Sequence, residues 1–226
     1  MSKFPKGKLL INTINAHSFN TALKDSLFAE ALTNGDYLIP DGMSIVMACK
    51  LLHAKSQPKE RVAGWDLFAY EMDKLNQTGG TVMFMGSSEK VLALNVAKCS
   101  ELYPNLKVVT FSPPYKPEFN DADNKSIIDA INNANPDLLW IGMTAPKQEK
   151  WTYSHWDELN IHCHVGTIGA VFDFFAGTMK RAPLWWQDHG LEWLYRLLKE
   201  PKRMWRRYII GNTLFLRNII NEKFSK

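Results

Sequence analysis

The sequence predicts an α/β protein: a Rossmann-like, three-layer and mostly parallel sheet, followed by a basic helical appendage at the C-terminus. At least five short apolar runs alternate with segments of helical periodicity, a pattern typical of buried strands joined by helices. Small and polar residues directly follow these runs, as they do at the ligand-binding edge of parallel sheets. The composition changes at Lys180, so we divide the chain into an α/β domain (1–179) and an appendage (180–226).

The composition is that of a globular cytosolic protein. Hydrophobic residues make up 46% of the 226 residues, which is enough to fill a core. Cys49, Cys99 and Cys163 lie far apart without a CxxC spacing, which indicates buried thiols rather than disulfides or a zinc site. The N-terminal apolar run is too short for a signal peptide, and no segment approaches the roughly 18 apolar residues of a membrane span.

The positive charge is concentrated in the appendage. The whole chain carries a net charge of +4, yet residues 196–226 alone contain nine Lys or Arg and two Glu, a net charge of +7. Residues 1–195 therefore carry −3. This asymmetry predicts an anionic partner for the tail, either an anionic lipid surface or nucleic acid, and not for the body.

The first two predicted strands bring polar side chains to the sheet edge. A strand at 9–11 precedes a predicted helix at 18–34, and Thr13 and Asn15 lie between them, where they could hold a ligand or cap the helix. A strand at 37–39 ends at Asp41 and Gly42, directly before a helix. A carboxylate there lies where α/β proteins bind ligands, although Asp is also a common N-cap or turn residue.

Arg61 and Asp66 precede and open the next helix, which extends to about Gln77. The forked guanidinium of Arg61 suits phosphate, and Asp66 could cap the helix or orient Arg61; a surface ion pair is the alternative. A buried strand at 81–85 then leads through Gly86 into a helix at 89–102. Gly86 would let phosphate or ribose approach the backbone, but the GxGxxG pattern of dinucleotide-dependent dehydrogenases is absent.

The next βα unit carries a weak metal motif. A strand at 107–111 and a loop at 113–119 precede a helix at 121–133. Asp121 and Asp123 match the Asp-x-Asp pattern of many sugar-nucleotide transferases, but they follow Asn120 at a helix start, where acidic residues favour the helix dipole. We therefore expect no metal site.

The strongest predicted strand, at 137–142, ends in a cluster of polar residues. Pro146 suits a first helical turn, and Lys147, Gln148 and Glu149 follow it, as candidates for helix caps or for chemistry at the sheet edge. A last strand at 161–165 leads to two glycines and an acidic residue that could contact a ligand: Gly166, Gly169 and Asp173.

The appendage interleaves aromatic and basic residues. Trp205, Tyr208, Ile209, Leu216 and Ile219 recur at helical spacing among arginines and lysines. This pattern is typical of a helix in a membrane interface, with aromatic rings at headgroup level and arginines on lipid phosphates. It also suits RNA binding, or packing on the body or on a second subunit.

Six motifs in this order resemble those of the WecG/TagA/CpsF glycosyltransferases, also called glycosyltransferase family 26. The resemblance extends from Thr13 to about Arg207, although Ile14 stands where we expect a proline. The motifs are Thr13–Ala16, Ile39–Gly42, Arg61–Asp66, Ala145–Trp151, Gly166–Asp173, and Lys180–Pro183 together with Gly190–Arg196.

The resemblance implies a metal-independent, inverting enzyme without a cofactor. Such an enzyme would move an N-acetylmannosamine-type or related sugar from a UDP-sugar onto a polyprenyl-diphosphate-linked sugar. Asp41 would be the base, Thr13 and Gln148 would line the active site, and Arg61 would lie near the reacting groups. The appendage would meet the inner face of the cell membrane and help close the site, with three candidate arginines for the diphosphate: Arg203, Arg206 and Arg207.

Two other functions are compatible with parts of the sequence. A UDP-sugar-modifying enzyme such as an epimerase would need a nicotinamide, and the missing GxGxxG disfavours it. A non-catalytic module that binds membranes or RNA would use the appendage but would leave Asp41, Arg61 and Gln148 without a purpose. We therefore expect a transferase with no nucleic-acid partner. Apolar and aromatic residues that a monomer would struggle to cover also suggest a homo-oligomer.

Overall fold

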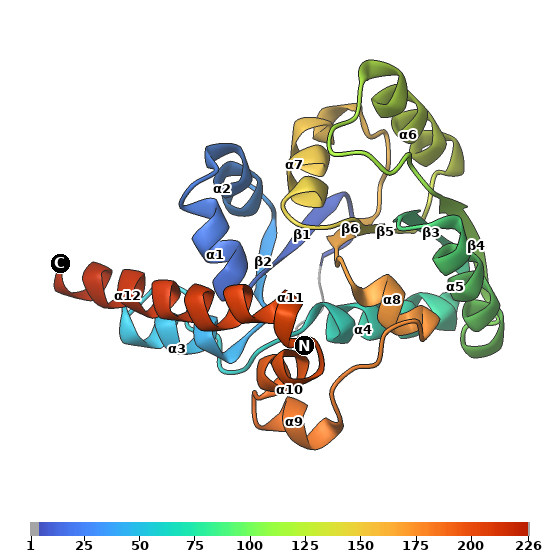
Figure 1. Cartoon of the computed structure of the whole chain (residues 1–226). Helices are drawn as coiled ribbons and strands as arrows, with labels where there is room; N and C mark the ends of the chain where they lie inside the picture. Colours follow the sequence, from blue (N-terminus) through green and yellow to red (C-terminus); the bar gives the residue numbers. More distant parts are fainter. Residues whose placement is uncertain (1–4, 226) are drawn as a thin grey trace.

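The computed structural model describes residues 5–225, without the side chain of residue 188. Six strands form a single sheet in the order β2-β1-β6-β5-β3-β4, and every pairing is parallel (Figure 1). The predicted α/β fold with a parallel sheet is therefore confirmed. The strands are β1 (Leu9–Ile14), β2 (Tyr37–Pro40), β3 (Gly80–Gly86), β4 (Leu106–Phe111), β5 (Leu138–Gly142) and β6 (His164–Thr167).

Helices cover both faces of this sheet, as expected for three layers. One face packs on α4, α5 and α8, and the other on α6 and α7. The helices of the α/β domain are α1 (Ala16–Ala22), α2 (Ser26–Thr33), α3 (Met43–Leu51), α4 (Gly64–Thr78), α5 (Glu89–Leu102), α6 (Asp121–Ala134), α7 (Lys147–Ser154), the 3₁₀ turn Trp156–Glu158 and α8 (Val171–Ala176).

Two predicted elements differ from the structure. The helix predicted at 18–34 is two helices: the first ends at Ala22, and Asp25 caps the second by accepting a hydrogen bond from Phe28 N at 3.0 Å. The strand predicted at 161–165 begins at His164. Ile161 and Cys163 are buried in the approach to it, so their apolar character reflects core packing rather than strand pairing.

Glycines in the sheet make room for the aromatic core. A Cβ on Gly166 would lie 2.2 Å from Trp140, which is 1% exposed, and one on Gly142 would lie 2.4 Å from the Phe172 ring. The Trp140 ring also packs on Phe68, with 5.4 Å between centroids. Large rings therefore fill one face of β5 and β6 because the neighbouring positions lack side chains.

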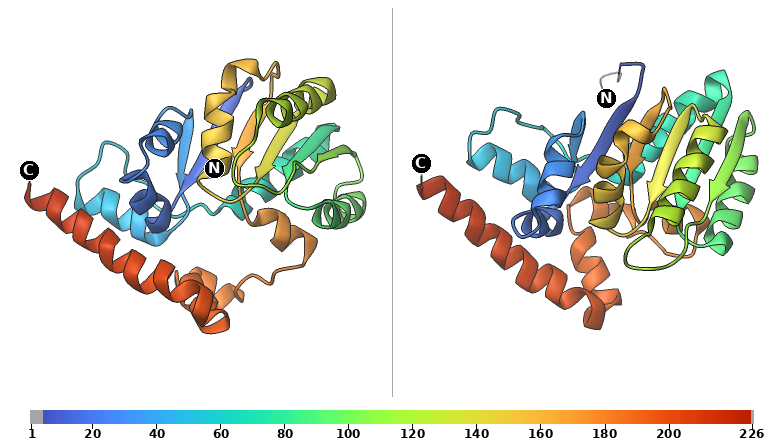
Figure 2. Two further views of the ribbon diagram at one scale, coloured as in Figure 1. Left: turned by 45° about the horizontal axis from the view of Figure 1, so that its top comes forward. Right: turned by 90° about the horizontal axis from the view of Figure 1, so that it is seen from above.

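The appendage contains four helices and a π-turn. Helix α12 lies along α1 and α3 in both views of Figure 2, and Phe215 and Ile219 are buried between them. The Phe215 ring meets Phe19 edge-on at 5.3 Å, and Asn20 Nδ2 donates to Gly211 O at 2.7 Å. The elements are α9 (Leu184–Asp188), α10 (Glu192–Lys199), α11 (Pro201–Trp205), the π-turn η2 (Arg206–Ile210) and α12 (Gly211–Phe224).

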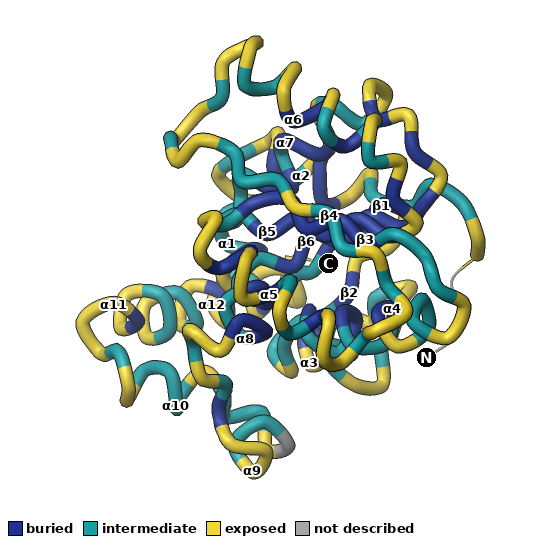
Figure 3. Tube along the Cα trace, turned by 90° about the vertical axis from the view of Figure 1, so that its right-hand side faces the viewer, coloured by how far each residue is buried: buried dark blue, intermediate teal, exposed yellow. Residues whose placement is uncertain are grey.

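The rest of the appendage is far less buried than the sheet. Figure 3 shows α9, α10 and α11 projecting beside a body whose strands are mostly buried. The opposite face of α12 exposes apolar side chains, including Leu216 at 57% and Phe224 at 82%. Within residues 5–225, none of the helices is both long enough and apolar enough to cross a membrane. The division at residue 180 stays a prediction, and its residues 1–4 and 226 lie outside the described part of the chain.

The packing of Gly166 generates a stability prediction. Gly166→Ala should lower the free energy of unfolding by about 1–3 kcal/mol, because the added methyl group meets the buried Trp140 ring. Gly211→Ala is the matched control: it places the methyl group in a helix with no atom closer than 3.8 Å, and should stabilise the protein by roughly 0.4–1 kcal/mol. Urea unfolding of both variants measures the difference, and equal midpoints would contradict this account of the core.

Candidate active site

Asp41 lies at the carboxyl end of β2, where two strands deliver their last residues to one point. Asp41 N donates to Ile14 O at 2.8 Å, which extends the β1–β2 pairing by one step. Gly42 then begins α3 as its N-cap residue. Asp41 is partly buried, so its carboxylate lies between the tip of β1 and the start of α3. Anions are favoured at such a helix start, because its backbone N–H groups lack partners within the helix.

Asn15 orients Asp41 from the neighbouring strand. Its Oδ1 caps α1 by accepting from His17 N at 3.0 Å and from Ser18 N at 3.1 Å. Its side chain also forms a hydrogen bond with Asp41, which leaves the NH₂ group as the donor to the carboxylate. Thr13 lies two residues earlier, is partly exposed and pairs in register with Ile39.

Arg61 joins the α/β domain to the appendage. Its segment is held beside β2, because Val62 N donates to Pro40 O at 3.0 Å. Arg61 Nη2 donates to Gln187 O of α9 at 3.2 Å, and Nη1 lies 3.6 Å from Glu192 Oε2 of α10. The guanidinium also acts electrostatically on Asp41. The residue expected near the reacting groups is therefore also a contact between body and appendage.

Arg207 approaches Asp41 from the appendage. It lies in η2, and π-turns inside α-helices are frequent at functional sites. Its Nε is buried without a hydrogen-bond partner among residues 5–225, and its charge acts on both Asp41 and His17. Arg203 and Arg206 face elsewhere: Arg203 pairs with Glu200 at 2.8 Å, and the exposed Arg206 lies 5.4 Å from the ring centre of Trp205.

These surroundings give Asp41 a base-like pKa. The pKa of Asp41 is raised from 3.8 to about 6, first by burial and then by the negative charge of Glu192. Arg61, the Asn15 hydrogen bond and Arg207 oppose the rise. A carboxylate with this pKa is ionised at neutral pH and still takes up a proton readily, which suits general base catalysis.

Gln148 connects two loops at the same sheet edge. Its Oε1 accepts from Met143 N at 3.0 Å and from Gly169 N at 3.2 Å, so it ties the loop after β5 to the loop after β6. Its Nε2 donates to Glu149 Oε1 at 2.8 Å. Gln148 is only 3% exposed, and its contacts indicate that it positions backbone; that it lines the active site stays a prediction.

Glu149 is a second carboxyl group with an unusual pKa. Burial raises the pKa of Glu149 to about 7. Within the described part of the chain, its Oε2 is buried without a hydrogen-bond partner. Its proton would keep an uncompensated negative charge out of the core, so we assign Glu149 to the support of Gln148.

Three of the residues expected to bind substrate have structural partners in the fold, and their binding of substrate stays a prediction. Asp66 Oδ2 accepts from Ala63 N at 2.9 Å, so Asp66 caps α4, which was the alternative to orienting Arg61. Lys147 Nζ donates to Lys116 O at 2.5 Å and lies 3.5 Å from the ring centre of Phe119. Asp173 accepts a hydrogen bond from the Thr178 hydroxyl at 3.3 Å.

The glycines expected at the ligand also serve packing. A Cβ on Gly86, whose φ is +118°, would lie 2.5 Å from Gly142 O, and the space beside Gly166 holds the Trp140 ring. Strand packing therefore explains both residues better than approach of a ligand. Gly169 has a φ of +54° and donates its N–H to Gln148.

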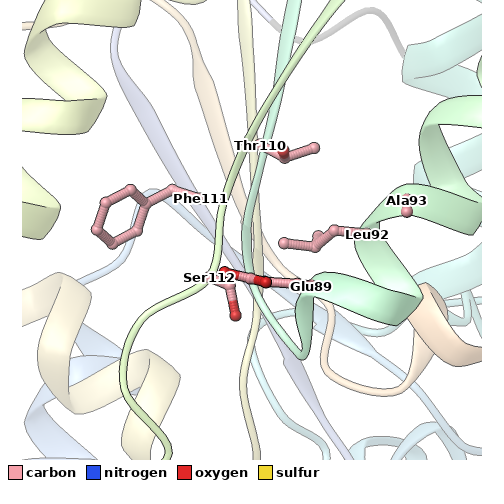
Figure 4. A pocket seen from close by; sticks show the side chains of 6 residues that line it. All are labelled: Glu89, Leu92, Ala93, Thr110, Phe111 and Ser112. Atoms are coloured by element: carbon pink, nitrogen blue, oxygen red, sulfur yellow. The ribbon is translucent and has the colours of Figure 1, made fainter.

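A separate cavity of about 400 Å³ lies at β4 and the start of α5. Figure 4 shows its lining, whose one charged side chain is Glu89. Because β4 and β2 are the opposite edges of the sheet, this cavity lies far from Asp41. Arg61, Glu192 and Arg207, by contrast, all act electrostatically on Asp41. Among the described residues, no three His, Cys, Asp or Glu side chains come together as a possible metal site.

Local sequence patterns did not identify three further residues near Asp41 and Arg61: Glu192, Gln187 and His17. Glu192 lies in a predicted motif, Gly190–Arg196, but it was not singled out there. One signal was present: it is an acidic residue at the border of a strongly basic segment. Its pairing with Arg61 depends on how the appendage folds back, which linear spacing does not report.

Comparisons with known proteins match nearly the whole chain. The family model described as "Glycosyl transferase WecG/TagA/CpsF family" matches residues 2–226. An N-acetylglucosaminyldiphosphoundecaprenol N-acetyl-beta-D-mannosaminyltransferase of Bacillus subtilis (strain 168) is 31% identical over 200 residues, which is 88% of this chain and 75% of that protein. A protein of the same name from Bacillus spizizenii is 31% identical over 204 residues, covering 90% of this chain and 76% of the relative.

The raised pKa of Asp41 predicts a pH-dependent gain of stability in Asp41→Asn. Because the folded-state pKa is above the ordinary value, this carboxyl group favours folding at low pH and loses that contribution as pH rises through about 6. The neutral amide should therefore raise the free energy of unfolding at pH 7.5 by about 1–2 kcal/mol, a figure that allows for solvent screening. Denaturant titrations at pH 7.5 and near pH 4 test this; a gain that is equal at both values would contradict it.

Proposed function

This chain belongs to the WecG/TagA/CpsF family of glycosyltransferases, and from this membership we propose its reaction. A UDP-sugar, with an N-acetylmannosamine-type or related sugar, is the donor. A polyprenyl-diphosphate-linked N-acetylglucosamine is the acceptor, in the synthesis of a wall polymer or surface polysaccharide. Support comes from the names of the two relatives, which give an N-acetylmannosaminyl group as the transferred unit and a diphosphoundecaprenol-linked N-acetylglucosamine as the acceptor.

The observation that carries this proposal is the Asp41 carboxylate, on which two arginines, Arg61 and Arg207, both act electrostatically. In the proposed reaction, an acceptor hydroxyl attacks the anomeric carbon of the donor while Asp41 takes up the hydroxyl proton. The new bond joins the acceptor oxygen to the anomeric carbon, and the bond to UDP breaks with its electrons leaving on the phosphate. A single displacement of this kind inverts the anomeric centre. The pKa of about 6 for Asp41 suits this role as base.

Arg61 and Arg207 are our candidates for the diphosphate. Both are close enough to lower the pKa of Asp41, and they come from different parts of the chain, so a diphosphate between them would receive charge from two sides. We propose that Thr13, Asn15, Gly42 and the Gln148 region line the same site. In our proposal, Arg203 and Arg206 contact the diphosphate of the lipid-linked acceptor or lipid headgroups, because both are exposed.

We further propose that the appendage closes the site and meets an anionic membrane surface. Three of its groups already reach the site: Gln187 O and Glu192 contact Arg61, and Arg207 acts on Asp41. Its outer surface exposes the basic residues Lys199 and Lys202 beside apolar side chains. A lipid-linked acceptor would therefore be met at the inner face of the membrane. The exposed apolar face of α12 also supports a homo-oligomer.

The first activity prediction concerns the base. Asp41→Asn should lower turnover by about 10²–10⁴-fold, because the amide cannot accept the hydroxyl proton. UDP release by purified protein, with a panel of UDP-sugars and a lipid-diphosphate N-acetylglucosamine acceptor, measures the loss. Asp121→Asn removes the same charge from an exposed helix start and should retain wild-type turnover.

Either of two results would contradict this assignment. Undiminished turnover in Asp41→Asn would contradict the role of Asp41 as the base. Absence of acceptor-dependent UDP release with every donor would contradict the proposed reaction. The same assay in EDTA should retain its rate, since arginines are proposed to neutralise the diphosphate.

A second prediction concerns the membrane. The double variant Lys199→Glu/Lys202→Glu should bind anionic liposomes about 30-fold or more weakly, because each lysine near an anionic surface contributes about 1 kcal/mol. Lys90→Glu/Lys107→Glu makes the same charge change on exposed residues at the far edge of the sheet and serves as control. Co-sedimentation measures both, and equal binding by the two double variants would assign membrane contact to another surface.

A further inference from the structure

Glu192 contacts the active site through Arg61. The Arg61 guanidinium is held by two groups of the appendage, Gln187 O on Nη2 and Glu192 Oε2 near Nη1. Both side chains of the ion pair are only about one-fifth exposed, at 20% for Arg61 and 21% for Glu192. Arg61 therefore interacts with two carboxylates, one from each part of the molecule: Asp41 and Glu192.

A purely structural role for Glu192 is the simpler alternative. It begins α10, where an acidic residue favours the helix dipole, and its contact with Arg61 helps to hold α10 on the body. This role accounts for the position of Glu192 at a helix start. It gives no reason for its proximity to Asp41, where a second negative charge opposes ionisation of the base.

We propose that Glu192 is a positioning residue that ties the appendage to the base through Arg61, and that the donor diphosphate competes with Glu192 for the Arg61 guanidinium. This inference rests on the proposed function, because it names Arg61 as a phosphate contact. The chemistry is an exchange of one anion for another on the same N–H donors. Arg61 Nη2 can keep its bond to Gln187 O, and Nη1 passes from a carboxylate oxygen to a phosphate oxygen.

The charges around Asp41 determine the sign of the pH effect. Arg61, Asn15 and Arg207 lower the pKa of Asp41, whereas Glu192 and burial raise it; His17 lies beside Arg207. Replacing Glu192 by glutamine removes only the raising charge. The pKa of Asp41 should then fall, and the base should remain ionised to a lower pH.

Glu192→Gln therefore has two expected effects. The acid limb of the pH profile of kcat/KM should move down by roughly half a pH unit. UDP should bind about threefold more tightly, since its diphosphate no longer competes with a carboxylate for Arg61. Titration calorimetry with UDP and initial rates between pH 5 and 8 measure both.

Two variants separate these effects from a general loss of charge or docking. Glu101→Gln removes the same charge from an exposed residue of α5, at the opposite edge of the sheet from Asp41, and should change neither quantity. Glu192→Asp keeps the charge and should retain the wild-type acid limb.

The outcomes distinguish this inference from the proposed function. An unmoved acid limb and unchanged UDP binding in Glu192→Gln, with active wild-type protein, would overturn the role of Glu192 and leave the transferase intact. Wild-type protein that neither binds UDP nor turns over would overturn the proposed function and this inference with it. If Glu192→Gln melts at a lower temperature and loses activity equally at every pH, the residue is structural and the inference is wrong.

Discussion

The charge balance at Asp41 is the constraint on which the rest of this structure depends. A partly buried carboxylate is costly to ionise, and the pKa of about 6 shows that burial and Glu192 outweigh the attractive partners. Those partners come from separate segments: Asn15 from the end of β1, Arg61 from the segment before α4, and Arg207 from the π-turn of the appendage. Movement of any of these segments would change the protonation of Asp41. The position of the appendage therefore helps to set the pKa of Asp41.

The parallel sheet makes this balance possible by fixing two strand ends together. The bond from Asp41 N to Ile14 O continues the β1–β2 pairing beyond the strands, and the bond from Val62 N to Pro40 O attaches the Arg61 segment to the same place. Rigidity comes from the core behind them, where glycines such as Gly166 allow aromatic rings to pack against the strands.

Local sequence patterns predicted the sheet and the residues at its edge. Apolar runs located all six strands, although β6 begins three residues later than expected, because Ile161 and Cys163 are apolar for the sake of the core. Asn15 could be predicted because it directly follows an apolar strand, and Arg61 because its forked guanidinium suits phosphate. Local patterns could not show which residues of the appendage act on Asp41 or contact Arg61. Three nearby arginines look alike in sequence, and only the folded structure shows that Arg207, rather than Arg203 or Arg206, acts on Asp41.

The contacts of α12 connect the outer surface of the appendage to Asp41. Phe215 packs on Phe19 of α1, Asn15 is the N-cap of α1, and Asn15 bonds to Asp41, so a continuous set of contacts joins the last helix to Asp41. At its N-terminal end α12 follows directly from the π-turn that carries Arg207. A surface that binds α12 would act on a helix that packs on α1 and continues the turn carrying Arg207. If that binding shifts Arg207, the coupling is reciprocal, and a ligand that orders Arg207 strengthens the docking of α12 by the same free energy.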